Sequence, residues 1–230
     1  MPVFLLDEED ISFPPPGIAK EDGLLAVGGD LKPERLIEAY KNGIFPWYSE
    51  GYPIMWWSPD PRMVMFPKDF KKSKSLRRLV EKGEFVVKFD TNFESVINAC
   101  ARVYRANEDG TWIVDDMIEA YTRLYKLGVA HSVETYKDGN LVGGLYGLAI
   151  GKVFFGESMF HHVSNASKVA YWHLINRLLE WDFEIIDAQQ ETEHFKSLGG
   201  KTIEREKFLT LLYNSVEKRQ DFKNWNINGR

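Results

Sequence analysis

A chain of 230 residues, 44% of them apolar and 27% charged, has the material for a substantial core, which excludes an intrinsically disordered protein. The single Cys100 excludes an intrachain disulfide framework or a site of several cysteines, and the net charge of −5 argues against a protein that coats nucleic acid. The first ten residues lack a signal-peptide pattern and no apolar run reaches about eighteen residues, so we expect a cytoplasmic protein without a membrane partner.

The first 62 residues predict a small domain with little regular structure. Residues 13–16 read Phe-Pro-Pro-Pro, which is stiff and extended. A helix of roughly ten residues is expected, with Asp30 and residues 32–34 giving an N-cap and an early-turn proline and Gly43 ending it. The prolines and tryptophans of residues 44–62 favour irregular packing. We place a domain boundary near Arg62, with a second domain at residues 63–230.

The rest of the chain alternates strand and helix patterns. Strands are expected at 63–66, 85–89, 131–136, 141–150, 153–160, 183–189 and 202–204, and helices at 75–82, 93–105, 115–127, 166–181, 193–198 and 206–217. Residues 137–140 carry a hairpin signal. This order predicts an α/β (α+β) fold with a mixed sheet and a central antiparallel meander, as in N-acyltransferases of the GNAT class.

A coenzyme A site is not expected in this fold. The Arg/Gln-x-x-Gly-x-Gly/Ala loop that binds the coenzyme pyrophosphate in GNAT proteins is missing. The glycines of residues 143–151 lie within a strand pattern, where they more often allow close approach of the backbone. We expect no cofactor. We expect no metal either, because the five histidines show no paired ligand spacing.

Two features of the second domain indicate a site. Glu157, Asp187 and Gln189 lie among apolar residues, where an unpartnered carboxylate or amide costs a few kcal/mol, so they belong either to a satisfied network or to a reacting centre. A basic run can neutralise phosphates or form a solvated helix face. Its members are Lys68, Lys71, Lys72, Lys74, Arg77 and Arg78.

Long consecutive motifs resemble the leucyl/phenylalanyl-tRNA–protein transferase family over nearly the whole chain. They include Trp-Trp-Ser-Pro-Asp-Pro-Arg at 56–62 and Phe-Gly-Glu-Ser-Met-Phe at 155–160. The others lie at 13–16, 23–31, 42–47, 75–78, 110–113, 131–132, 143–147, 165–168, 186–187 and 197–199. The resemblance implies a monomer that moves leucine or phenylalanine, less often methionine, from aminoacyl-tRNA to proteins with N-terminal Arg or Lys, in the N-end rule degradation pathway.

The same resemblance implies that Asp187 and Gln189 are catalytic. We expect Asp187 to orient or polarise Gln189 and to accept proton density, and Gln189 to contact the attacking amine or the ester. Glu157 is expected to bind the aminoacyl ammonium or the basic side chain of the acceptor, the alternative being a buried hydrogen-bonded carboxylate.

An apolar pocket is needed to select leucine and phenylalanine, although one methylene provides only about 1–3 kcal/mol of discrimination. The candidates are Leu145, Phe154, Met159, Leu174, Leu178 and Ile186, each of which also suits a plain core position. Trp47 and Trp112 are candidates for stacking on the 3′ adenosine or for sealing the domain junction.

Other functions remain open. A non-catalytic aminoacyl-tRNA-binding module would bind the same ligand without consuming it. A coenzyme A-dependent N-acyltransferase would ignore tRNA. A serine hydrolase is disfavoured, because Phe160 stands where the strained turn around Ser158 requires glycine.

Overall fold

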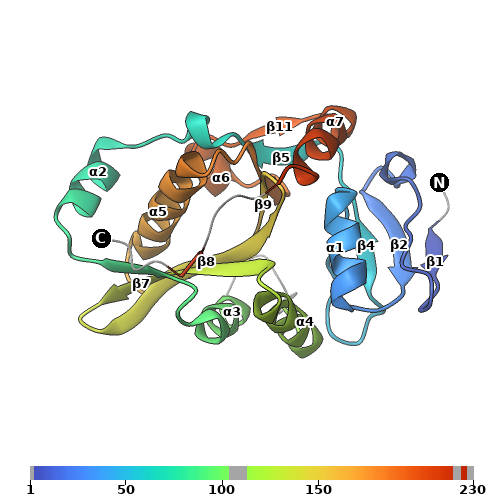
Figure 1. Cartoon of the computed structure of the whole chain (residues 1–230), viewed down its shortest axis with the longest axis horizontal. Coiled ribbons are helices and arrows are strands. Elements are labelled where there is room, and N and C mark those ends of the chain that lie inside the picture. The colour runs from blue at the N-terminus through green and yellow to red at the C-terminus, as the bar shows by residue number, and fades with distance from the viewer. Residues whose placement is uncertain (1–2, 104–112, 220–223, 227–230) are drawn as a thin grey trace.

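The computed structural model describes residues 3–103, 113–219 and 224–226. The chain forms two sheets, one from the N-terminal residues and a larger one from the rest (Figure 1). Trp112 and the predicted end of a helix at residue 105 lie outside the described residues.

The N-terminal residues form a four-stranded sheet. The strand order is β1 (Phe4–Leu6), β2 (Leu24–Gly28), β4 (Met55–Trp57) and β3 (Phe45–Pro46), with β1 and β2 parallel and the other pairs antiparallel. The predicted helix is confirmed as α1 (Pro33–Lys41). The prediction of a domain otherwise without regular structure is wrong. Strands of two to five residues are too short to show alternation, and their partners are distant in sequence.

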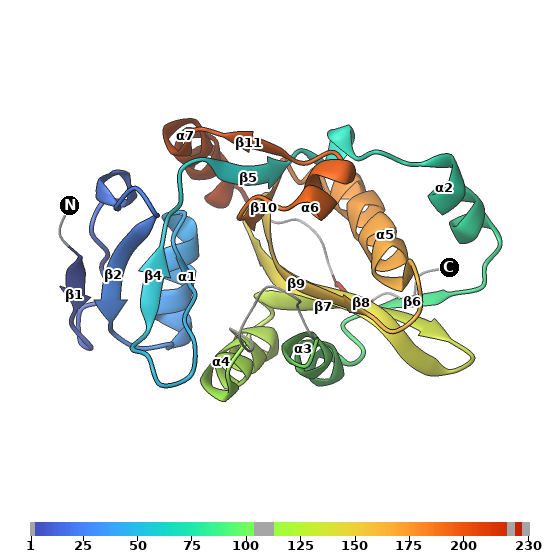
Figure 2. The ribbon, with the colours of Figure 1, turned by 180° about the vertical axis from the view of Figure 1, so that it is seen from behind.

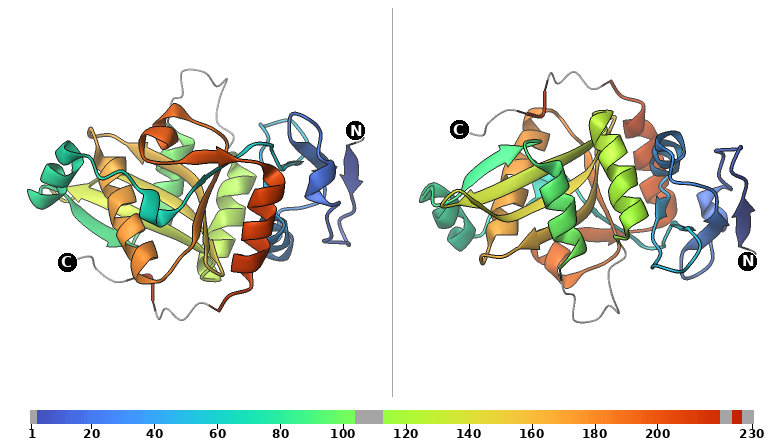
Figure 3. Two further views of the ribbon diagram at one scale, coloured as in Figure 1. Left: turned by 90° about the horizontal axis from the view of Figure 1, so that it is seen from above. Right: turned by 90° about the horizontal axis from the view of Figure 1, so that it is seen from below.

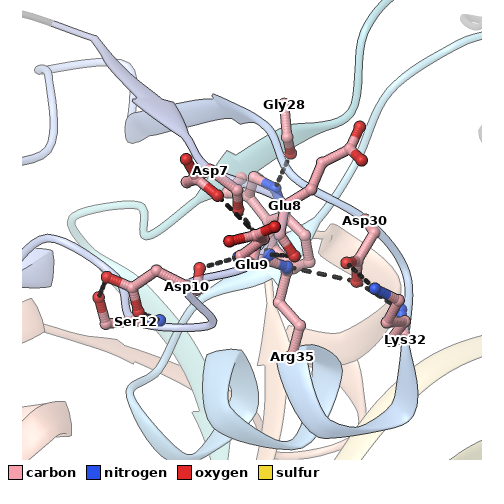
Figure 4. A network of polar contacts seen from close by, with 10 residues as sticks. Asp7, Glu8, Glu9, Asp10, Ser12, Gly28, Asp30, Lys32 and Arg35 are labelled. Atoms are coloured by element: carbon pink, nitrogen blue, oxygen red, sulfur yellow. Dashed lines mark hydrogen bonds and ion pairs between the residues drawn. The ribbon is translucent and has the colours of Figure 1, made fainter.

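Arg35 of α1 holds the acidic loop that follows β1. Its guanidinium, fully buried, donates to the backbone oxygens of Asp7, Glu8 and Asp10 at 2.7–3.1 Å and to the carboxylate of Asp30 at 3.3 Å (Figure 4). The buried carbonyls of this loop therefore have partners, and the acidic side chains remain at the surface.

The large sheet has seven strands. Their order is β11 (Lys201–Ile203), β5 (Arg62–Met65), β10 (Ile185–Gln189), β9 (Val153–His161), β8 (Asn140–Ile150), β7 (Ala130–Lys137) and β6 (Val86–Phe89). Among the described strands of this sheet, β9 and β10 run parallel and the other neighbours antiparallel. The predicted mixed sheet with a central β7–β8–β9 meander is confirmed. Asp138 and Gly139 both have positive φ in the β7–β8 turn, as the hairpin signal predicts.

Helices cover both faces of the large sheet. α3 (Phe93–Ala101) and α4 (Asp115–Lys126) pack on one face, and α5 (Ala166–Glu180) packs on the other (Figure 2). α2 (Lys74–Glu81) contacts α5, α6 (Glu193–Ser197) follows β10, and α7 (Arg205–Val216) packs against β9 and α1. No helix among the described residues is both long and apolar enough to cross a membrane.

The N-terminal sheet and the large sheet share one core. Tyr40 and Trp56 belong to the same buried cluster as Phe155 of β9 and Phe208 of α7. A second cluster fills the space between the sheet and α5, and Leu145, Phe154 and Leu174 belong to it. The first cluster holds α1 beside β9 of the large sheet, close to the candidate site residues.

Candidate active site

The site forms where β9 and β10 stop pairing. Their parallel ladder ends at Phe155 and Asp187. The next residues of both strands are bulged: Glu157 is the extra residue of β9 against β8, and Ala188 is the extra residue of β10 against β5. Bulges re-aim side chains and interrupt pairing. Gln189, just beyond the second bulge, has a φ of 56°, a left-handed conformation that costs energy in a residue other than glycine.

These bulges bring Glu157 and Gln189 together, with two tyrosines. The Glu157 carboxylate accepts hydrogen bonds from the Tyr40 hydroxyl at 2.7 Å, the Tyr121 hydroxyl at 3.0 Å and Nε2 of Gln189 at 3.0 Å. The two hydroxyls also contact each other. Tyr40 comes from α1 of the N-terminal unit and Tyr121 from α4, so three separate parts of the fold hold one carboxylate.

The electrostatics of this network favour a proton on Glu157. Burial raises the pKa of Glu157 to about 7, against the lowering effect of the hydrogen bonds from Tyr40 and Tyr121, and the nearby charge of Asp187 raises it further. Burial, and then the Glu157 charge, raise the pKa of both tyrosines well above their usual value. Glu157 is therefore the acidic side chain of the site that can change protonation near neutral pH.

Asp187 is held by a buried arginine. Arg62 of β5 donates Nε to Oδ1 at 2.8 Å and Nη2 to Oδ2 at 2.7 Å, and both side chains are fully buried. Nη1 of Arg62 donates to the backbone oxygen of Gly43 at 3.0 Å, and the guanidinium lies between the rings of Phe45 and Phe208. A planar fork matched to a carboxylate is the geometry in which Arg differs from Lys.

The predicted contact between Asp187 and Gln189 exists, in a different form from the one expected. The backbone N–H of Gln189 donates to Oδ1 of Asp187 at 3.0 Å, while the side-chain amide donates to Glu157. Asp187 therefore orients Gln189 through its backbone. Its partner Arg62 lies 125 residues earlier in the chain, so sequence spacing did not reveal it.

An apolar cavity of about 370 Å³ opens beside this network. Seven of the predicted substrate-binding residues line it together with Gln189: Leu145, Phe154, Glu157, Met159, Leu174, Ile186 and Trp47. Trp47 packs edge-on against Trp57 with ring centroids 5.6 Å apart. Leu178 of α5 is fully buried in the second core cluster and does not line the cavity. The structure therefore places it in the core, which was the alternative to a pocket position.

The sequence reading missed several members of this site. Tyr40 and Tyr121 lie in two predicted helices and were not selected as site residues, although a tyrosine buried in an apolar stripe needs a partner for its hydroxyl. Arg62 was read as a domain boundary. Tyr171 and Phe195 also line the cavity, and His194 lies at it with its pKa lowered, first by burial and then by Lys168 and His161.

The six predicted basic residues are exposed together on α2 and the segment before it. A second cavity of about 350 Å³ lies beside them and is lined by Arg78 and Lys82 of this region and by Lys168 at the start of α5. Lys168 is far from the basic run in sequence, and the fold places it beside Arg78 and Lys82. Within the residues that the structure describes, no cluster of three His, Cys, Asp or Glu side chains could hold a metal ion.

Comparison with known proteins matches most of the chain to one family. Residues 64–213 match the model described as leucyl/phenylalanyl-tRNA protein transferase, and residues 29–60 match the model of its N-terminal domain. The chain belongs to the leucyl/phenylalanyl-tRNA–protein transferase family. The resemblance drawn from the sequence motifs is therefore confirmed.

Curated relatives match the chain over nearly its whole length. The transferase of Syntrophobacter fumaroxidans is 55% identical over 98% of this chain and 96% of its own length. That of Nitrosospira multiformis is 53% identical over 94% of each chain. A GCN5-related N-acetyltransferase from Kribbella flavida covers 74% of this chain and 60% of its own, with a TM-score of 0.39 and 11% identity.

Proposed function

We propose that this protein transfers leucine or phenylalanine from aminoacyl-tRNA to the α-amine of proteins that begin with Arg or Lys, within the cytoplasm. Membership of the family makes it an aminoacyltransferase that uses aminoacyl-tRNA and a protein. The observation that carries the finer proposal is the Glu157–Gln189 pair at the wall of an apolar cavity. Apolar and acidic surfaces meet there, as a Leu or Phe donor and a cationic acceptor require.

Charge supports a cationic acceptor. Two carboxylates, Glu157 and Asp187, face one arginine, so the network carries a net negative charge whenever Glu157 is ionised. Asp187 is neutralised by Arg62, which leaves Glu157 as the group that can attract an ammonium or guanidinium group. An acceptor with an N-terminal Arg or Lys presents two such positive groups.

The reaction needs no activation by a nucleotide. The neutral α-amine attacks the ester carbonyl, a tetrahedral oxyanion forms, the amine loses a proton, and the 3′ hydroxyl of the tRNA leaves with a proton as the peptide bond is completed. An α-amine with a pKa near 8 has a usable neutral fraction at pH 7. Positioning and electrostatic stabilisation are the tasks left for the protein.

We assign roles from the hydrogen bonds. Gln189 contacts the amine or the ester, with its amide held by Glu157 and its backbone held by Asp187. The positive charge of Arg62 neutralises Asp187, so Asp187 acts by position, and we transfer the predicted role of proton acceptor to Glu157, which among the described residues has no such counter-ion in contact with it. A carboxylate whose pKa is about 7 is suited to accept a proton near neutral pH.

The donor side chain is assigned to the apolar cavity. Leu145, Phe154, Leu174 and Ile186 provide its wall, and Met159 provides an unbranched side chain that adapts to leucine or phenylalanine. Trp47 lies at the same cavity and is the described candidate for stacking on the 3′ adenosine. The exposed basic run on and before α2, with Lys168 beside it, is assigned to phosphates of the tRNA.

The proposal is tested with radiolabelled Leu-tRNA and a peptide that begins with Arg. We expect label to move to the peptide, and to stay on the tRNA when the peptide begins with Ala or when the Arg α-amine is acetylated. Glu157→Gln and Gln189→Ala should reduce transfer by at least about tenfold. Equal transfer to Arg- and Ala-initiated peptides would refute the acceptor assignment.

The alternatives give different results in the same assay. A binding module would retain labelled tRNA on a filter but leave the peptide unchanged. A coenzyme A-dependent enzyme would acylate the peptide only when an acyl-coenzyme A replaced the tRNA.

A further inference from the structure

Phe154 is a cavity-lining residue whose position is closely confined. Its side chain is 1% exposed and points from β9 toward α5. The ring lies over Gly147 of β8, where an added Cβ would stand 2.7 Å from two ring atoms. The absence of a side chain at residue 147 therefore lets the ring lie flat on the sheet, and Phe154 cannot move further toward β8.

A second neighbour of the Phe154 ring is a residue close to the end of the chain. Trp225 is 4% exposed, and its ring centroid lies 6.0 Å from that of Phe154. It stacks on His131 of β7 at 4.1 Å and meets Trp181, which follows α5, edge-on at 5.0 Å. Figure 3 shows this short C-terminal segment, in dark red, beside the end of α5.

The seat of Trp225 is itself fixed. His131 pairs with Gly147 across β7 and β8, so the stacked Trp225 covers β7 beside the residue of β8 over which the Phe154 ring lies. Nδ1 of His131 lies 2.7 Å from Oδ2 of Asp90, and Oδ1 of Asp90 accepts from the backbone N–H of Ser132 at 2.8 Å. A ring stacked on a side chain anchored in this way has a defined position.

We propose that Trp225 is a positioning residue that sets the depth of the donor pocket by closing the space behind Phe154. The inference rests on the proposed function, which places the leucyl or phenylalanyl side chain against Phe154. Trp225 does not line the cavity, so it acts through Phe154. It also lies outside residues 64–213, the part of the chain that the family model matches.

The physical basis is close packing. Interiors have few voids, so a ring that packs against both Gly147 and Trp225 has little space into which it can retreat from a ligand. Removing Trp225 leaves space behind Phe154 that the surrounding residues fill only in part. The ring can then move back and deepen the cavity, which favours the larger phenylalanyl side chain over the leucyl one. A size difference in an apolar pocket changes discrimination by about ten- to two-hundredfold, and a partial opening should give a change near the lower end.

The test compares kcat/KM for Leu-tRNA and Phe-tRNA with an Arg-initiated peptide, in wild type and in Trp225→Ala, Trp225→Leu and Trp225→Phe. In Trp225→Ala we expect the ratio of kcat/KM for Phe-tRNA to kcat/KM for Leu-tRNA to rise by about five- to tenfold, mainly through a higher KM for Leu-tRNA. In Trp225→Phe we expect this ratio to return most of the way to the wild-type value. Trp172→Ala is the matched control. Trp172 is 9% exposed in the same core cluster, and its ring packs against Phe70 and Lys72.

The outcomes separate the possibilities. A loss of stability in both Trp→Ala variants with a changed donor ratio only in Trp225→Ala supports the proposal. An unchanged ratio in every Trp225 variant, or an equal change in Trp172→Ala, overturns it. If Trp225→Ala does not fold, the Phe/Leu ratio in Trp225→Leu decides, because that variant retains part of the apolar volume: a raised ratio supports the proposal and an unchanged one overturns it. A wild-type protein that transfers neither amino acid would refute the proposed function instead.

Discussion

The buried pair of Arg62 and Asp187 makes a quantitative prediction for stability. Arg62→Met keeps much of the contact with Phe45 and Phe208 but leaves the carboxylate of Asp187 buried without its counter-charge. Breaking a buried ion pair from one side costs about 3–5 kcal/mol, and losing the hydrogen bond to the Gly43 oxygen adds about 1 kcal/mol. The total of about 4–6 kcal/mol is a large part of the 5–15 kcal/mol that is typical for a folded domain.

The free energy of unfolding is measured by urea denaturation at pH 7, followed by circular dichroism. Adding Asp187→Asn to Arg62→Met should recover at least about 2 kcal/mol, because it removes the unpaired charge. Arg123→Met is the control. It breaks an exposed pair with Glu119 and should cost about 0.5 kcal/mol or less. An Arg62→Met variant within about 1 kcal/mol of wild type, or a double variant that recovers nothing, would refute this account of the pair.

Four further predictions follow from single contacts. Folding raises the pKa of Glu157 from 4.5 to about 7. Wild type should therefore lose about 3 kcal/mol of stability as the pH rises from 4.5 to 7. Glu157→Gln should remove this dependence of the free energy of unfolding on pH, as measured by urea titrations. Tyr40→Phe removes a hydrogen bond that lowers this pKa, so the acid limb of its pH–rate profile should move to higher pH; an unmoved limb would exclude Glu157 as the titrating group. Gly147→Ala places a Cβ 2.2 Å from the Phe155 oxygen and should lower the free energy of unfolding, measured by urea denaturation, by about 3 kcal/mol or more. Gly17→Ala, with open space around the added Cβ, should lower it little. Arg78→Ala should weaken tRNA binding and reduce the slope of log K against log salt by about 1; an unchanged slope would remove Arg78 from the phosphate contacts.

The parts of the fold that sequence predicted well are those specified locally. The stripe of Met117, Tyr121 and Leu124 defines α4 by its spacing alone, and the turn at residues 137–140 defines the β7–β8 hairpin. The N-terminal sheet was not predicted, because β3 has two residues and its partner β4 lies eight residues beyond it. Pairing of such short strands depends on the surrounding core and not on their own pattern.

The sequence indicated candidate residues of the site better than it indicated the contacts between them. Glu157, Asp187 and Gln189 could be selected as polar residues in apolar strands, and in the structure Gln189 bonds to Asp187 through its backbone and to Glu157 through its side chain. Their partners Arg62 and Tyr40 could not, because each contact spans more than a hundred residues. Nothing in the spacing of residues 153–161 shows that a bulge at Glu157 changes the direction of its side chain.

The hydroxyl of Tyr40 has a consequence for how this enzyme can be rebuilt. Tyr40 lies in the part of the chain matched by the N-terminal family model, and its hydroxyl donates to Glu157 in the part matched by the other model. A polypeptide that begins after residue 62 would therefore lack one of the hydrogen-bond donors to Glu157. Chimeras that exchange the first 60 residues between relatives should work only where the incoming segment brings a phenol to that point. The two units are thus matched by separate family models, but both are needed to form the hydrogen bonds of the site.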